Sequence, residues 1–161
     1  MIEIYPMLVL ILQFVALFIL ALVTGIFWGP WFALHRSMAN FSATEFLHIT
    51  RTMVGNLGIP MRILMPSCIL AMASSAWFYP DRQSAGFYFS LAALVLSIIA
   101  LTVTMAVEVP IVKQIDRWTD TTIPEGWQSL RDRWLSFHII RVASSLCSFA
   151  CLLIALLYLV K

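Results

Sequence analysis

Four apolar stretches, each about as long as a bilayer is thick, constrain this 161-residue chain more than any other feature of its sequence. The hydrocarbon core of a bilayer is about 30 Å thick, so a helix needs roughly 20 apolar residues to cross it. The predicted spans cover residues 7–34, 60–79, 85–110 and 127–160. Inside lipid every backbone polar group must be paired, which favours helices. The sequence therefore predicts one all-α transmembrane domain over residues 1–161, a polytopic membrane four-helix bundle.

The composition agrees with an integral membrane protein. Hydrophobic residues make up 61% of the chain and charged residues 11%, whereas a soluble domain has about 45–50% and about 25%. The formal net charge of +2 is too small to suggest a nucleic-acid partner. The lipid bilayer is the partner that this composition predicts most directly.

The basic residues predict how the bundle is oriented. Seven of them lie in or beside the two longer connections between spans: Arg36, Arg51, Arg62, Lys113, Arg117, Arg131 and Arg133. Arg82 and Lys161 fall at the opposite ends of the spans. By the positive-inside rule, we expect both long connections in the cytoplasm and both termini outside.

The segment between the first two spans, residues 41–55, is predicted to form a short interfacial helix. Its mixture of apolar and polar residues is typical of a helix at the membrane surface. Ser42 and Glu45 have the spacing of a capping box. Glu45 and His48 also have the spacing by which one helix of a four-helix carboxylate protein supplies two metal ligands, so both are candidate ligands.

Polar residues inside the spans give the strongest indication of a site, because ionisable groups are costly in lipid unless they face a protein interior or a watery cavity. In the fourth span, spacings of three and four place on one helix face Trp127, Arg131, Trp134, His138, Arg141, Ser145 and Ser148. The third span has a similar stripe of Ser90, Ser97, Thr104 and Glu108, and the first has Thr24, Trp28, Trp31 and His35. We expect the three stripes to face the inside of the bundle.

Glu108 and His138 are predicted to share one layer near the cytoplasmic leaflet. Each lies five residues inside a flanking basic residue, Lys113 or Arg133, which is about 7 Å along a helix. In a catalytic interpretation, Glu108 or His138 removes a proton from a substrate hydroxyl or activated carbon, and Arg141 stabilises the resulting oxyanion.

Other interpretations of the same residues stay open. A buried pair of Glu108 and Arg141, with His138 as a hydrogen-bond partner, would fix the helix register without any reaction. No cofactor is identified: a single Fe, Zn or Mn could be held by His48, His138 and Glu108, or the site could hold no metal. Trp134 and Trp31 are candidate substrate-binding residues, since their rings can stack on a lipophilic aromatic molecule.

Two segments near the end of the chain carry a family resemblance. Val109-Pro110-Ile111, followed by Trp127-x6-Trp134-x3-His138-x2-Arg141, resembles the anthrone oxygenase-like family of small four-helix membrane proteins. That family typically has Asn two residues after the Pro, where this chain has Val112. The resemblance implies a four-helix fold and, for some members, oxygen-dependent oxidation of a polycyclic phenolic anthrone to a quinone. It carries over His138 and Arg141 as site residues.

Two functions of different classes follow from the sequence. The first is a membrane-embedded oxidoreductase or oxygenase-like protein that acts on a lipophilic aromatic or quinone-like molecule at the polar layer near the cytoplasmic leaflet. The second is a non-catalytic accessory or scaffold subunit of a larger membrane complex or homo-oligomer. Gly25 and Gly29 motivate the second, because small residues four apart let another helix approach closely.

Overall fold

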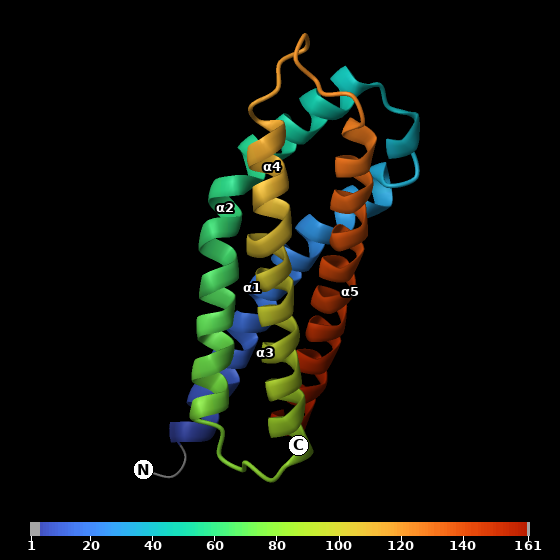
Figure 1. Cartoon of the computed structure of the whole chain (residues 1–161). Helices are drawn as coiled ribbons and strands as arrows, with labels where there is room; N and C mark the ends of the chain where they lie inside the picture. Colours follow the sequence, from blue (N-terminus) through green and yellow to red (C-terminus); the bar gives the residue numbers. More distant parts are fainter. Residues whose placement is uncertain (1–3, 161) are drawn as a thin grey trace.

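The computed structural model describes residues 4–160 and confirms the all-α bundle (Figure 1). Its elements are α1 (Ile4–Leu34), the 3₁₀ turn η1 (Met38–Asn40), α2 (Ala43–Trp77), α3 (Ala85–Val103), the π-turn η2 (Thr104–Glu108), α4 (Val109–Ile115) and α5 (Trp127–Val160). Because η2 joins α3 to α4 without a break, the chain has four helical rods, and all four are long and apolar enough to cross a membrane.

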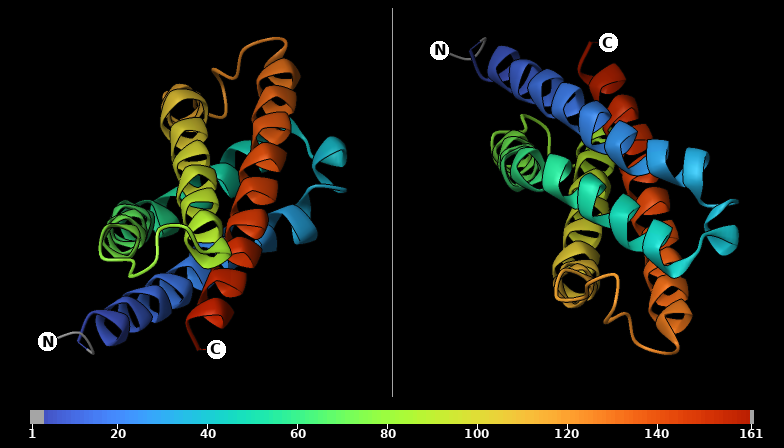
Figure 2. Two further views of the ribbon diagram at one scale, coloured as in Figure 1. Left: turned by 90° about the horizontal axis from the view of Figure 1, so that it is seen from below. Right: turned by 90° about the horizontal axis from the view of Figure 1, so that it is seen from above.

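The four rods run alternately up and down (Figure 1). The first and last described residues and the short loop between α2 and α3 lie at one end, here called the terminal end. The two longer connections lie at the other, the connection end. α1 packs against α2 and α5, and α3 packs against α5 and α2. The α3–α5 interface is the most extensive, the α2–α3 interface is the least, and α1 is tilted across the others (Figure 2).

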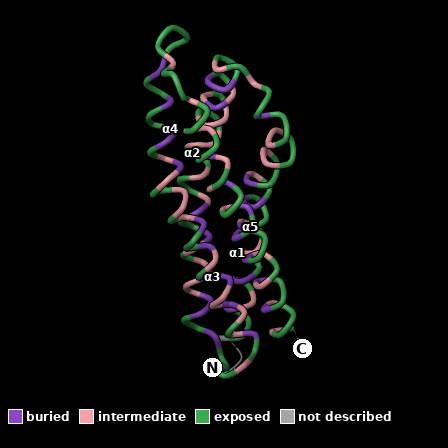
Figure 3. Tube along the Cα trace, turned by 45° about the vertical axis from the view of Figure 1, so that its right-hand side comes forward, coloured by how far each residue is buried: buried purple, intermediate pink, exposed green. Residues whose placement is uncertain are grey.

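Buried residues follow the inner faces of the helices, and exposed residues cover the outside (Figure 3). From the terminal end to the connection end, three buried clusters centre on Met72, on Phe27 and on Phe46. Many large apolar side chains point outward instead, among them Phe14, Phe32, Leu70, Met105 and Leu157. Such a surface is expected where lipid, and not water, surrounds the helices.

The segment predicted to form a short interfacial helix is helical, but it continues into the second span as one 35-residue helix, α2. Its predicted capping box is confirmed: the Glu45 N–H donates to the Ser42 hydroxyl over 3.3 Å, and the Ser42 N–H donates to the Glu45 carboxylate over 2.8 Å. Pro60 and Pro66 lie inside α2, where a proline bends a helix. In Figure 1 the first part of α2 runs obliquely across the connection end before turning along the bundle.

Close helix packing occurs at a different glycine from those expected. A Cβ atom at Gly25 or Gly29 would meet nothing within 4 Å, so this pair does not bring two helices of the chain together. At Gly86 of α3, an added Cβ would clash with the Tyr79 hydroxyl and lie 2.8 Å from the Cβ of Tyr158. Burial in this contact raises the pKa of the Tyr79 hydroxyl.

Candidate functional site

A π-turn in the third rod positions Glu108. In η2 the N–H of Val109 bonds to the carbonyl of Thr104, five residues earlier. Pro110 follows directly, and a proline has no N–H and clashes with the carbonyl four residues before it, so a regular α-turn is disfavoured here. Such a wider turn changes which side chains face inward and is frequent at functional sites. Glu108 ends the turn and is only 4% exposed.

The fourth rod supplies the other two ionisable residues. α5 covers Trp127–Val160, as predicted, and its polar stripe is the buried face: Trp134, His138, Ser145 and Ser148 are buried. The His138 side chain is 3% exposed, and that of Arg141, one turn later, is 12% exposed. Burial of the stripe follows from its spacing, because a polar helix face is poorly solvated by lipid.

Glu108, His138 and Arg141 contact one another and are here called the polar triad. Nη1 of Arg141 forms an ion pair with Oε2 of Glu108. Nη2 of Arg141 donates a hydrogen bond of 2.8 Å to Nδ1 of His138. The same Nδ1 lies 3.6 Å from Oε1 of Glu108. The structure thus brings together the three residues that the sequence singled out as candidate catalytic groups.

Phe27 of α1 contacts the triad through both its backbone and its ring. Its carbonyl oxygen is 3.1 Å from Nε2 of His138, and its ring lies under the Arg141 guanidinium, with 4.2 Å from Cζ to the ring centre. A carbonyl only accepts hydrogen bonds, and a guanidinium only donates them. The imidazole must therefore carry its hydrogen on Nε2 and accept the Arg141 hydrogen bond through Nδ1.

This tautomer leaves Oε1 of Glu108 without a hydrogen-bond donor, because the nearest nitrogen, Nδ1 of His138, is itself an acceptor. Within residues 4–160, Oε1 of Glu108, Nε of Arg141 and Nε1 of Trp134 are buried and have no hydrogen-bond partner. An unsatisfied buried polar atom costs about 1–3 kcal/mol. The site therefore offers one acceptor and two donors to a ligand, which can recover this free energy.

The two candidate substrate-binding tryptophans have different surroundings. Trp134 is buried and stacks on His138, with ring centres 5.6 Å apart and planes inclined by 26°. Trp31 is half-buried on α1, where its ring lies 5.1 Å from that of Trp28 and 5.9 Å from that of His35. The prediction that Trp28 faces inward is wrong, because Trp28 is 41% exposed and Phe27 occupies the inward position.

Glu45 and His48, the candidate metal ligands, are both exposed and have other partners. Glu45 accepts a 2.7 Å hydrogen bond from the Ser42 hydroxyl, and Nε2 of His48 lies 3.2 Å from the carboxylate of Asp120. Across the described part of the chain, no three His, Cys, Asp or Glu residues are grouped to hold a metal ion. The structure therefore does not gather His48 with Glu108 and His138.

Two residues with buried polar contacts, Phe27 and Gln13, were not recognised from the sequence. Phe27 gives no sequence signal, because it is apolar and acts partly through its backbone. Gln13 is fully buried and donates a 2.6 Å hydrogen bond to Ser90 on α3, nearer the terminal end. It is the only polar residue between Met7 and Val23, and a lone amide in such a run is a signal that would have identified it.

Residues 45–151 match the family model described as anthrone oxygenase. The matched stretch makes up more than half of the chain and contains the whole polar triad, but it leaves out α1 and therefore Phe27. No curated protein and no solved structure matches the chain.

Proposed function

The chain belongs to the anthrone oxygenase family, and on this premise we propose that it is a membrane-embedded oxygenase whose polar triad takes a proton from a lipophilic aromatic ketone. One observation carries the proposal. Oε1 of Glu108 is a buried carboxylate oxygen, lies beside the cationic Arg141 and has no hydrogen-bond partner in the described structure. A carboxylate oxygen without a donor partner can act as a general base toward a ligand that enters the site.

The ion pair with Arg141 keeps the net charge of the site constant while the proton moves. In the resting site the guanidinium is balanced by the Glu108 carboxylate. Once Glu108 takes a proton, the substrate carries the negative charge and becomes the partner of Arg141. No uncompensated charge is created in the interior, where it would cost several kcal/mol. Arg141 is then the group that stabilises the oxyanion.

The reaction that fits this arrangement is oxidation of a ring methylene to a carbonyl. Glu108 removes a proton from the methylene between two aromatic rings, and the electron pair of the broken C–H bond is delocalised onto the ketone oxygen. The carbanion then forms a C–O bond to dioxygen, and the peroxide takes up the proton. Loss of the second methylene hydrogen with cleavage of the O–O bond releases water. In sum, an anthrone and dioxygen give a quinone and water.

His138 and Trp134 are proposed to position the reacting groups. His138 holds one guanidinium nitrogen of Arg141 and is itself fixed by the Phe27 carbonyl. Since Nδ1 is occupied by Arg141, we assign the base role to Glu108 and not to the imidazole. The indole N–H of Trp134 and the Nε–H of Arg141 are available donors for a ligand carbonyl. A flat aromatic molecule with a carbonyl and an acidic hydrogen matches these groups.

We also propose that the connection end faces the cytoplasm. Two of the seven basic residues, Arg36 and Arg117, lie in the connections at this end, and the others lie on α2, α4 and α5: Arg51, Arg62, Lys113, Arg131 and Arg133. Arg82 lies in the loop at the terminal end, and Lys161 is outside the described residues. The positive-inside rule then places the triad, which is nearer the connection end, in the cytoplasmic half of the bilayer.

The test is turnover by the purified protein in lipid vesicles, with anthrone as substrate and quinone absorbance as the signal. Glu108→Gln keeps the size of the side chain but removes the base, so turnover is expected to fall by about 100-fold or more. Glu45→Gln is the matched control, because Glu45 is exposed and caps α2, and its turnover should be unchanged. If Glu108→Gln turns over as fast as the wild type, the triad only fixes helix register, as in an accessory subunit.

A further inference from the structure

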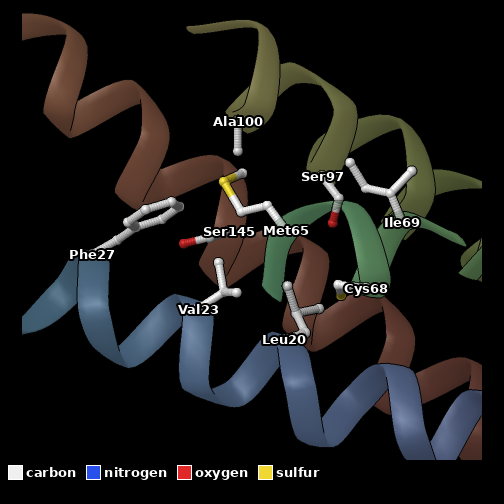
Figure 4. A pocket seen from close by; sticks show the side chains of 9 residues that line it. All are labelled: Leu20, Val23, Phe27, Met65, Cys68, Ile69, Ser97, Ala100 and Ser145. Atoms are coloured by element: carbon white, nitrogen blue, oxygen red, sulfur yellow. The ribbon is translucent and has the colours of Figure 1, made fainter. Parts of the chain in front are cut away.

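An apolar pocket adjoins the triad across the ring of Phe27. It lies among the four long helices and is lined by Leu20 and Phe27 of α1, Met65 of α2, Ala100 of α3 and Ser145 of α5, among others (Figure 4). Phe27 thus forms one wall of the pocket with the same ring that carries the Arg141 guanidinium. The free volume is about 10 Å³, which is close to the space that one water molecule needs.

The lining residue of the pocket that lies nearest the outer surface is Ile69 of α2. Among its lining residues Ile69 alone is half-buried, and the others are buried. The next residue, Leu70, is 68% exposed and faces outward. Ile69 belongs to α2, whose interface with α3 is the least extensive between neighbouring rods.

The polar groups that line the pocket are already paired. The Ser145 hydroxyl donates to the Val142 carbonyl over 3.0 Å, and the Ser97 hydroxyl is hydrogen-bonded to that of Ser148 at 2.8 Å. The Cys68 thiol donates to the carbonyl of Ala16 in α1 over 3.5 Å. A molecule in the pocket therefore finds an apolar wall and no unsatisfied polar atom, in contrast to the triad side of Phe27.

We propose that this pocket takes up dioxygen from the bilayer and passes it along the Phe27 ring to the substrate at the triad. The inference rests on the proposed function, which requires dioxygen. Dioxygen is small and apolar, so it favours hydrocarbon over water, whereas a polycyclic aromatic substrate is far larger than the pocket. Met65 reaches into the pocket (Figure 4), and its unbranched thioether chain can adjust as a molecule passes.

Dissolved oxygen is itself the probe, because it is paramagnetic and broadens the NMR signals of methyl groups that it approaches. In micelles under oxygen pressure, three methionine methyls can be compared. Met65 lines the pocket and is 5% exposed, Met72 is 1% exposed and outside it, and Met105 is 60% exposed to the surroundings. We expect Met65 to broaden nearly as much as Met105, with Met72 little affected. Broadening of Met65 as weak as that of Met72 would overturn the proposal.

A pair of neighbouring substitutions tests delivery to the reaction. Ile69→Trp places a large ring at the half-buried edge of the pocket and should remove the oxygen broadening of Met65. It should also raise the KM for dioxygen about tenfold and leave the KM for the anthrone unchanged. Leu70→Trp places the same ring one residue away on the lipid-facing surface. In this variant the oxygen broadening of Met65 and the KM for dioxygen should stay at their wild-type values.

A second variant fills the pocket from inside. Ala100→Val adds two methyl groups at its α3 wall and should likewise raise the KM for dioxygen. Ala93→Val, two turns earlier on the same buried face, is the control for added bulk. An unchanged KM for dioxygen in both Ile69→Trp and Ala100→Val would refute delivery through the pocket. If no anthrone is turned over at all, the proposed function fails, while the Met65 broadening still decides whether oxygen enters.

Discussion

Arg141 is the residue on which the geometry of the triad depends, because it donates to both Glu108 and His138. Its guanidinium also lies on the ring of Phe27. Two opposite charges buried together are stabilised mainly by each other, and loss of one leaves the other uncompensated. The contribution of each charge to the free energy of unfolding therefore depends on whether its partner is present.

A double-mutant cycle measures this dependence. Arg141→Met alone should lower the free energy of unfolding in mixed micelles by about 3–5 kcal/mol, because the Glu108 carboxylate stays buried without its partner. Adding Glu108→Leu should restore most of the loss, since an apolar pair of similar volume replaces the ion pair. Additive effects of the two substitutions would show that the charges are not coupled.

Single residues differed in how well their roles could be predicted. Glu108, His138 and Arg141 were recognisable because lipid is a poor solvent for charge, so their position in apolar spans was informative in itself. Phe27 supplies a carbonyl, which every residue has, and an apolar ring, which looks like any core residue. The spacing of Glu45 and His48 suited metal ligands, but Ser42 and Asp120 are the partners that the fold brings to them.

At the scale of the elements, the π-turn decides whether Glu108 can meet Arg141. A regular α-helix turns by about 100° per residue, so removal of the extra residue in the turn would swing Glu108 away from α5 by roughly that angle. Pro110 directly follows Val109, whose N–H forms the hydrogen bond of the π-turn. Because a proline at this position disfavours a regular α-turn, the wider turn is retained.

Pro110→Ala is expected to lower turnover without weakening the helix. The substitution permits a regular α-turn and removes a residue that disfavours helix, so thermal stability should be equal or higher. Turnover should fall by about tenfold or more, because Glu108, the proposed base, is displaced from the guanidinium. Pro66→Ala in α2 serves as the control for loss of a proline in a span. Unchanged turnover in Pro110→Ala would mean that the turn does not depend on this proline.

The elements were predictable where local chemistry defines them. The capping box of α2 follows from residue spacing, and the span predicted over residues 127–160 from apolar length matches α5. The unbroken course of α2 was not predicted, because Gly58 and Pro60 are signals that usually interrupt a helix, and packing within the bundle overrides them. The π-turn was not predicted either, because a proline such as Pro110 disfavours a regular α-turn but does not specify the form that the backbone takes instead.

At the scale of the whole molecule, the bundle is asymmetric along its length. The charged and polar connections gather at one end, and the terminal end has a single short loop (Figure 1). This asymmetry is the basis for an orientation across the membrane, since basic residues are retained on the cytoplasmic side.

Cysteine labelling of cells tests the orientation. In a variant without Cys68, Cys147 and Cys151, a cysteine is introduced by Gln83→Cys in the short loop or by Thr121→Cys in the last long connection. A membrane-impermeant maleimide should label the first in intact cells and the second only after the membrane is permeabilised. The cysteine-free chain gives the background signal. Labelling in the reverse order would place the long connections outside.

Phe27 belongs to α1, which lies outside the stretch that matches the family. A mutational screen confined to the matched stretch would therefore leave untouched a residue that contacts the triad and also lines the apolar pocket. Any change in the size of this ring alters the triad and the pocket together, so neither can be engineered through it independently. A library aimed at bulkier substrates should instead keep this phenylalanine and vary the residues around Trp134.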